Sequence, residues 1–265
     1  MRFTAMTFNV RGSFHEDGAN DWDQWRDLNL RTLLRHAPDI VGFQEAQSGN
    51  LNAYDSVLMD YESEHGPVAV RTTDRFQHVR IYWKRARFTK AAAGGFYLSE
   101  TPEAWSLSWG STLVRSATWV RLRDSSTGGE CLVLNTHFPH EPDSDRARTE
   151  CARLIVERLE VLGQNKMPAL ILGDFNAAPG SDAYRIFTDA GYHDAHLAAG
   201  GDETVNTFHG FQGMAFPRRG IRIDWIMVHP RQRTLAVSQC VTLTDAEPPL
   251  YPSDHYPVMA KLELT

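Results

Sequence analysis

Hydrophobic residues recur along the chain in short runs of the length and pattern that β-strands require. Such runs are rich in β-branched and aromatic residues, and several of them alternate apolar with polar positions. The segments that fit this description are 3–10, 39–44, 79–83, 117–123, 131–138, 169–175, 221–228, 234–241 and 256–264. The pattern therefore predicts a protein dominated by strands.

Helical periodicity is clearest in the segment 143–163, which has an acidic first turn and a terminal glycine. Its apolar stripe consists of Ala147, Cys151, Leu154, Ile155, Leu159 and Leu162. A second helix is predicted over about 23–36, closed by Pro38, and a third begins at Ser181. We expect the long helix to cover a sheet.

No repeat, low-complexity tract or Pro/Ser-rich linker separates these elements, so residues 1–265 are predicted to form one domain. Some strands are continuously apolar and others alternate, which favours two packed sheets with helices outside, an α/β (α+β) fold. The segments 91–110 and 200–220 are predicted to be long loops.

Composition adds little to this picture. The chain has three scattered cysteines, which we expect to be reduced, because their spacing suggests neither a disulfide framework nor a zinc site. It begins with a strand pattern rather than a signal peptide or membrane span, so we expect a monomeric, soluble, cytoplasmic protein. The net charge of −6 argues weakly against sequence-independent nucleic-acid binding, because such binding depends on Lys and Arg at phosphates.

Polar residues with metal-binding or acid/base chemistry stand at the ends of several of the apolar strands, one of them within a strand and one group before the last strand. They are Asn9, Gln44 with Glu45, Asn135 to His137, Asp174 with Asn176, Asp224, and Ser253 to His255. Strand ends can converge on one rim of a sheet, where such side chains can hold a hard cation and a phosphate together. We expect this rim to be open to solvent.

Six of these motifs carry a resemblance to a known family. TFNVRG, VGFQE, NTHFPH, LGDFNAAP, RIDWIMV and SDHYPV, in this order over almost the whole chain, resemble the endonuclease/exonuclease/phosphatase superfamily. The resemblance implies a four-layered α/β/β/α sandwich with two mixed sheets. It also implies hydrolysis of a phosphoester with Mg²⁺ or Mn²⁺.

The resemblance assigns roles to individual residues. Glu45 is the expected metal ligand, with Asn9 orienting it and Asp254 helping to hold the site. Asp174 resembles the residue that orients or deprotonates the attacking water, and Asn176 the residue whose amide donates to a phosphoryl oxygen.

Two histidines complete the expected catalytic set. The family pattern pairs His255 with Asp224, which would favour a protonated ring facing the phosphate. His137 is similar to the histidine of the deoxyribonuclease I branch, but Gln77 stands where the family often has Glu, so its carboxylate partner is in doubt.

Substrate-binding residues are harder to predict. Arg115 matches a position that often reaches the substrate phosphate. Trp109, His209 and Phe211 are further candidates. Two alternatives remain open for the aromatic loop residues, which either form a stacking wall for a base or a sugar or pack the long loops down; they are Trp105, Trp109, Phe211 and Phe216. We expect His140 at the rim of the loops, and His15, His36 and His65 at the surface.

Three functions remain open from the sequence. The first is a metal-dependent phosphoesterase acting on a small or nucleotide-like substrate, and the second is a nuclease for single-stranded RNA or DNA. The third is a binding module that has lost catalysis, against which the complete set of Glu45, Asp174, Asn176, Asp224 and His255 speaks. The leaving group depends on loop shape and is not predicted.

Overall fold

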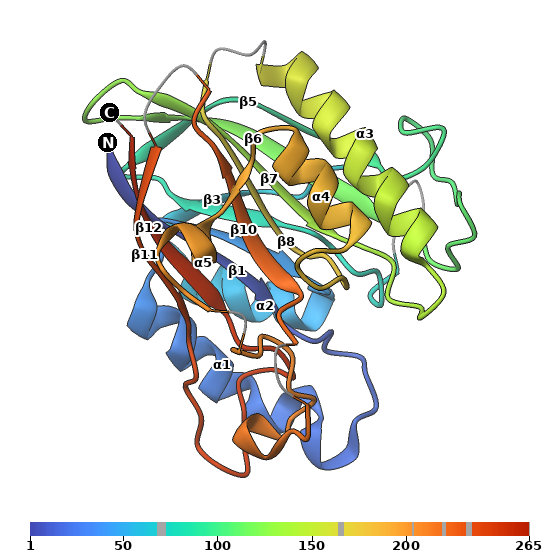
Figure 1. The fold of residues 1–265 in the computed structure, drawn as a ribbon. Helices are drawn as coiled ribbons and strands as arrows, with labels where there is room; N and C mark the ends of the chain where they lie inside the picture. Colours follow the sequence, from blue (N-terminus) through green and yellow to red (C-terminus); the bar gives the residue numbers. More distant parts are fainter. Residues whose placement is uncertain (68–72, 164–166, 203, 219–220, 232–234, 265) are drawn as a thin grey trace.

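The computed structural model describes residues 1–67, 73–163, 167–202, 204–218, 221–231 and 235–264. Two six-stranded sheets lie face to face, and helices cover their outer surfaces (Figure 1). This is the four-layered α/β/β/α sandwich that the sequence motifs imply. Residues 203 and 219–220 of one expected loop, and residue 234 of an expected strand, lie outside the described residues.

The first sheet is built around β1 (Arg2–Asn9). This strand pairs in parallel with β2 (Ile40–Gln44) and antiparallel with β12 (Val258–Leu264). The remaining strands give the order β11-β12-β1-β2-β4-β3, with β3 (Tyr61–Glu64), β4 (Ile81–Lys84) and β11 (Leu235–Thr242). Because β1 and β2 run in parallel, Asn9 lies beside Gln44 at the same end of the sheet.

The second sheet has the order β5-β6-β7-β8-β10-β9. Its strands are β5 (Phe88–Tyr97), β6 (Ser116–Asp124), β7 (Glu130–His137), β8 (Ala169–Asp174), β9 (His193–Asp194) and β10 (Asp224–His229). The parallel pair β7 and β8 places His137 beside Asp174. The antiparallel pair β8 and β10 places Asp224 beside Asp174 from the other side.

The two faces of each strand pack into different layers. Phe3 and Ala5 of β1 belong to the core between the sheets, whereas Met6 and Phe8 pack under the helices. On the second sheet Leu170 and Leu172 face the inner core, and Ile171 packs outward. This alternation follows from the two-residue period of a strand, and burial on both faces explains why residues 169–172 are apolar without interruption.

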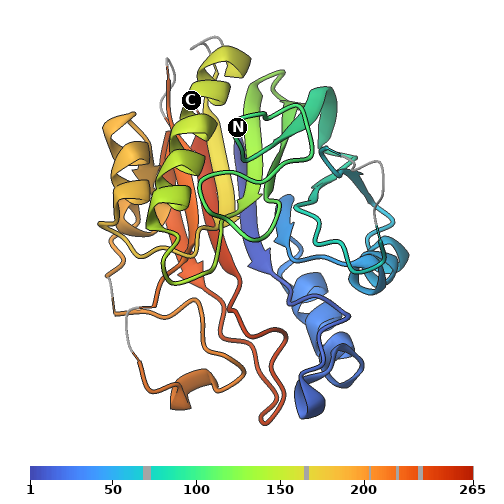
Figure 2. The same cartoon turned by 90° about the vertical axis from the view of Figure 1, so that its right-hand side faces the viewer.

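Helices form the outer layers. Figure 2 shows α1 (Trp22–His36) and α2 (Ser48–Val57) on one side of the sandwich and α3 (Asp145–Gly163) and α4 (Asp182–Asp189) on the other. Helix α1 ends at Ala37 in the left-handed conformation, directly before Pro38. The hydroxyl oxygen of Ser181 accepts a hydrogen bond from Tyr184 N and caps α4, as the sequence predicts. A short helix, α5 (Ala195–Ala198), lies near β10 and β11.

Several sequence predictions are corrected by the structure. The expected loop over 91–110 is wrong in its first part, because the strand β5 continues to Tyr97 despite its small residues. Helix α2 and strand β3 escaped the sequence analysis because both are rich in polar residues. The strand expected over 221–228 begins only at Asp224.

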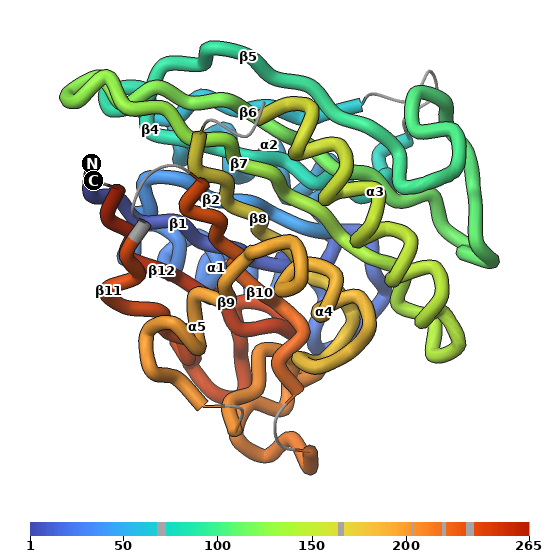
Figure 3. The backbone as a smooth tube through the Cα atoms, turned by 45° about the horizontal axis from the view of Figure 1, so that its top comes forward, coloured from blue at the N-terminus to red at the C-terminus, as the bar shows by residue number. Residues whose placement is uncertain are grey.

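The two chain ends lie side by side (Figure 3), where the Met1 amino group donates to Leu264 O at 2.7 Å. None of the described helices has the length and apolar character that crossing a membrane requires.

Candidate active site

Strand ends from both sheets meet at one rim of the sandwich. Asn9 ends β1 in the first sheet, His137 and Asp174 end β7 and β8 in the second, and Asp224 begins β10. The amide of Asn9 joins the two sheets, since its Nδ2 donates to Glu45 Oε1 at 3.1 Å and to Asp174 Oδ2 at 2.9 Å. Asn9 is fully buried, so this bridge holds the two carboxylates in fixed positions.

Asp174, Asp224 and His255 form a buried cluster beside this bridge. His255 Nδ1 lies 2.9 Å from Asp224 Oδ2, and His255 Nε2 lies 3.8 Å from Asp174 Oδ2. One possible ligand atom from each residue lies within 4.8 Å of the other two, so the group could hold a metal ion. The expectation of an open rim is wrong for these residues, because Asp174 is only 1 % exposed and His255 only 5 %.

The electrostatics of the cluster follow from burial and from its two carboxylates. Burial and the neighbouring charge of Asp224 raise the pKa of Asp174 to about 7. Burial opposes the charged form of His255, but the carboxylates of Asp224 and Asp174 outweigh it and raise the pKa of His255 to about 10. At neutral pH the cluster therefore contains an imidazolium and a carboxyl group close to its titration point.

Glu45 lies next to this cluster at the end of β2. Its backbone has a φ of 60°, in the left-handed region that non-glycine residues rarely adopt. His15 Nε2 lies 3.1 Å from Glu45 Oε2, and Gln77 Nε2 donates to the same oxygen at 3.1 Å. Although burial opposes ionisation, the contacts with His15 and Asn9 lower the pKa of Glu45 well below its usual value.

His137 lies between an arginine on its Nδ1 side and the carboxylate of Asp174 on its Nε2 side. Arg115 Nη1 lies 3.0 Å from His137 Nδ1 and donates to Gln77 Oε1 at 3.1 Å. Because a guanidinium can only donate, Nδ1 must accept, and the neutral ring carries its proton on Nε2, 3.4 Å from Asp174 Oδ2. Burial and the charge of Arg115 accordingly hold the pKa of His137 well below its usual value.

Asn176 follows β8 in the left-handed conformation, with a φ of 48°. Its backbone N donates to Asp174 Oδ1 at 2.9 Å, and its side-chain amide donates to Phe138 O at 3.2 Å. The same amide lies 3.1 Å from His137 Nε2. Asp174 is thus fixed by Asn9 on one oxygen and by Asn176 on the other.

Asp254 lies at the edge of the site. Arg11 Nη1 is 3.9 Å from Asp254 Oδ2, and the neighbouring Ser253 hydroxyl donates to Asn9 O at 2.7 Å. Burial raises the pKa of Asp254. The structure therefore brings Asn9, Glu45 and the SDH motif together, as the sequence predicts.

The sequence analysis missed part of the site. His15, expected at the surface, contacts Glu45, and Gln77 links Glu45 to Arg115. The sequence position of His15 could have indicated its role, because His15 lies in the loop that follows β1 and this loop begins beside the site residue Asn9.

Three expected substrate-binding residues have packing contacts. Trp109 packs against the core under α3 and α4, and the Phe211 ring lies 6.0 Å from that of Trp25 in α1. His209 is fully buried, and its ring lies 4.0 Å from that of Tyr256. Burial and the charge of His255 lower the pKa of His209 to about 3.

A fold of two packed sheets with buried acids, amides and imidazoles at one rim defines a class of phosphoester hydrolases. The model of the Endonuclease/Exonuclease/phosphatase family matches residues 6–255, and the chain belongs to this family. Members of the family are hydrolytic enzymes that act on phosphoester bonds, and they generally use divalent metal ions. A comparison with curated protein sequences found no match.

Solved structures with the same fold cover the whole chain. An endonuclease/exonuclease/phosphatase from Bacteroides vulgatus is 28% identical, with a TM-score of 0.89 and 100% of both chains covered. A mannosyl-6-phosphatase from Bacteroides thetaiotaomicron is 29% identical, with a TM-score of 0.88, and the match covers 98% of this chain and 99% of that one. The catalytic domain of human Nocturnin, at 20% identity and a TM-score of 0.78, with 100% and 95% covered, shares the fold.

Proposed function

We propose that the chain is a Mg²⁺- or Mn²⁺-dependent hydrolase that directs water at the phosphorus of a small phosphoester. The observation that carries this proposal is the buried group of Asp174, Asp224 and His255, joined to Glu45 through Asn9. Buried carboxylates that lie together are unfavourable without a positive partner, so a cation is expected to bind beside them. The bound cation would in turn attract an anionic substrate.

The donor set at the rim fits a hard cation. Glu45 and Asp254 supply carboxylate oxygens for the ion. The amide nitrogen of Asn9 donates a hydrogen bond to Glu45 and so holds this carboxylate in place. Among the described residues, Asp224 Oδ1 is buried and accepts no hydrogen bond, so the acids of the site are short of positive or donating partners. When bound, the ion would neutralise charge on the phosphoryl oxygens.

His255 is a poor ligand for that ion. Without a metal ion the pKa of the ring is raised to about 10, mainly by the carboxylates of Asp224 and Asp174, so an ion at this imidazole would have to displace a proton. We therefore place the ion at Glu45 and Asp254, and assign the imidazolium of His255 to an oxygen of the substrate phosphate. Asp224 fixes the orientation of this ring.

Asp174 is the proposed proton acceptor for the attacking water. A general base works best when its pKa lies near the working pH, and the pKa of Asp174 is raised to about 7. Hydrogen bonds from Asn9 and Asn176 hold both carboxylate oxygens, so the base is positioned before substrate arrives.

The opposite side of the site supplies donors for the phosphate. The side-chain amide of Asn176, the neutral Nε2–H of His137 and the guanidinium of Arg115 lie next to one another. Charge that develops on the phosphoryl oxygens would be stabilised by such fixed donors. In this assignment Arg115 supplies the positive charge that His137 lacks.

A phosphorylated sugar is the substrate class best supported. The mannosyl-6-phosphatase is 29% identical over almost the full length of both chains. The net charge of −6 also favours a small ligand over a long nucleic acid.

The test is phosphate release by the purified protein from hexose 6-phosphates, nucleoside monophosphates, RNA and DNA, in Mg²⁺, in Mn²⁺ and in excess EDTA. We expect release from a hexose phosphate that EDTA abolishes and Mg²⁺ restores. Undiminished hydrolysis in EDTA would contradict metal dependence. Preferential cleavage of single-stranded nucleic acid, falling steeply with salt, would contradict the substrate assignment and favour a nuclease.

A further inference from the structure

A cavity of ≈ 390 Å³ opens beside the catalytic rim, on the side of the second sheet. The lining residues that matter here are Arg75, Phe76, Gln77, Trp105, Leu113 and Arg115. Ligand pockets usually span about 300–1,000 Å³, so this volume suits a single small ring rather than a polymer.

The cavity is joined to the reacting groups by two of its own lining residues. Gln77 donates to Glu45 Oε2 at 3.1 Å, and Arg115 Nη1 lies 3.0 Å from His137 Nδ1. A molecule whose phosphate reaches Arg115 can therefore extend its remaining part into the cavity.

One wall of the cavity is aromatic and exposed. Trp105 is 48% exposed and Leu113 is 44% exposed, which is unusual for large apolar side chains. The indole of Trp105 contacts two other rings, with its centroid 5.3 Å from that of Phe76, which also lines the cavity, and 5.6 Å from that of Tyr97. Because these rings contact one another, they form a single fixed platform with one side available for stacking.

The charge of the lining also indicates the ligand. Among the described lining residues there are two arginines and no carboxylate, in a chain whose net charge is −6. The contacts of the Arg75 guanidinium with described residues are weak: it lies 5.9 Å from the centroid of the Phe14 ring and 3.8 Å from Glu16, in a pair of exposed side chains. The Arg75 guanidinium is thus available to a ligand.

We propose that this cavity binds the sugar ring of a phosphorylated sugar, an inference that rests on the function proposed above. The apolar face of the ring stacks on Trp105, and its hydroxyl edge accepts hydrogen bonds from Arg75 and Gln77. A nucleobase has two apolar faces to cover, whereas the described lining offers one aromatic wall. The cavity therefore suits a sugar ring, with its one apolar face, better than a nucleobase. The cavity selects the substrate, while the rim performs the hydrolysis.

The test compares binding of mannose 6-phosphate, the ringless glycerol phosphate and adenosine monophosphate by titration calorimetry in Mg²⁺. Asp174→Asn is the background for every variant, because it should slow turnover at least about a hundredfold. Trp105→Ala removes the platform, and Arg75→Gln removes the guanidinium from an exposed position. Leu107→Ala is the matched control, since Leu107 is 52% exposed in the same segment but is not among the lining residues.

We expect mannose 6-phosphate to bind at least about fivefold more tightly than glycerol phosphate. This preference should fall to about one in Trp105→Ala, fall in part in Arg75→Gln and persist in Leu107→Ala. A preference unchanged in both Trp105→Ala and Arg75→Gln would overturn the proposal, as would tighter Trp105-dependent binding of adenosine monophosphate.

Hydrolysis of mannose 6-phosphate by the protein with Asp174 intact separates the two claims. Trp105-dependent binding without any hydrolysis would reject the proposed function and retain the cavity. Hydrolysis together with Trp105-independent binding would reject the cavity and retain the function.

Discussion

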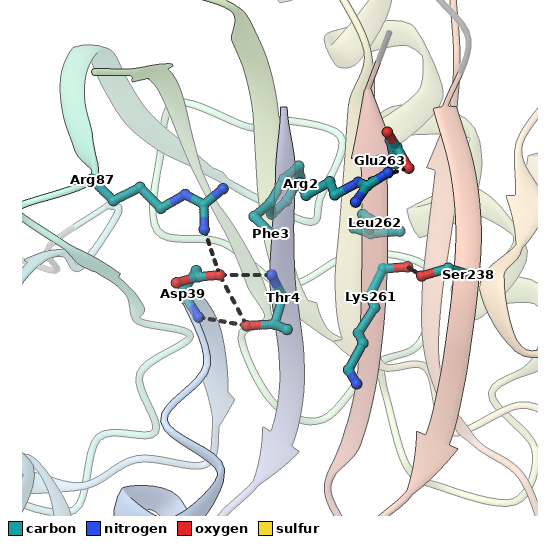
Figure 4. A pocket seen from close by; sticks show the side chains of 9 residues that line it. All are labelled: Arg2, Phe3, Thr4, Asp39, Arg87, Ser238, Lys261, Leu262 and Glu263. Atoms are coloured by element: carbon teal, nitrogen blue, oxygen red, sulfur yellow. Dashed lines mark hydrogen bonds and ion pairs between the residues drawn. The ribbon is translucent and has the colours of Figure 1, made fainter. Parts of the chain in front are cut away.

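The two ends of the sandwich both carry buried or half-buried acids, but the surroundings of these acids differ. At the end away from the catalytic rim, Asp39 accepts hydrogen bonds from Thr4 N at 2.9 Å and from Arg87 Nη1 at 3.0 Å (Figure 4). Lys84 Nζ lies 3.2 Å from its other oxygen. Every oxygen of this carboxylate has a positive or donating partner.

At the catalytic rim the acids are instead placed beside one another. Asp174 is paired in register with Asp224, and burial together with this neighbour raises the pKa of Asp174 to about 7. The far end is also hollow, with a cavity of ≈ 500 Å³ lined by Asp39 and Arg87, so a cavity alone does not identify a site. The rim differs from the far end because its neighbouring carboxylates have fewer positive partners than Asp39 has.

The largest expected effect is on His255. His255→Gln keeps a polar side chain beside Asp224 but removes the positive charge, so kcat should fall by at least about a hundredfold. His229→Ala is the control, because His229 ends the strand that Asp224 begins and lies away from the rim. Steady-state phosphate release measures both variants, and a His255→Gln variant with more than about a tenth of the parental kcat would contradict the assignment.

A smaller effect is expected for Arg115. Arg115→Lys keeps the charge but loses the forked geometry, so KM should rise about tenfold while kcat falls less. Arg123→Lys provides the comparison at the other end of β6, where Arg123 pairs with Glu130. An equal change of KM in both variants would show that Arg115 has no particular contact with the substrate.

The smallest effect concerns stability without metal. The pKa of Asp174 is raised from about 4 in the unfolded chain to about 7 in the folded protein, so ionisation of this group destabilises the fold. The destabilisation is complete above about pH 7 and disappears as the pH falls to about 4. In EDTA, Asp174→Asn should therefore raise the melting temperature at pH 8 and not at pH 4. Scanning calorimetry at the two pH values measures this, and a stabilisation that grows toward acid pH would have the wrong sign.

Sequence reasoning reached the fold and the strand-end residues because both depend on local signals. An apolar run that ends in GDFN places Asp174 at the end of a strand. An apolar run that follows SDH places His255 just before a strand, and neither inference needs the tertiary structure. The contacts of His15, Gln77 and Arg115 could not be predicted in this way. They join segments up to 62 residues apart, as between His15 and Gln77, and depend on how the loops fold.

The aromatic loop residues show the same limit. Trp105 and Trp109 lie four positions apart in the same segment, yet Trp105 lines a cavity while Trp109 packs against the core. Both are tryptophans of one loop segment, so the sequence pattern does not distinguish them, and the left-handed backbone of Trp109, with a φ of 57°, is equally absent from that pattern.

The most direct test of the contrast between the two ends is a side-by-side measurement of Asp174→Asn and Asp39→Asn in saturating Mg²⁺. Each variant removes one carboxylate charge with little change of shape. Asp174→Asn should lower kcat at least about a hundredfold. Asp39→Asn should keep kcat within about twofold and lose about 1–3 kcal/mol of folding stability, because the ion pairs of Arg87 and Lys84 with this carboxylate are lost. Parental kcat in Asp174→Asn, or a comparable loss of kcat in Asp39→Asn, would contradict the claim that the rim alone performs the chemistry.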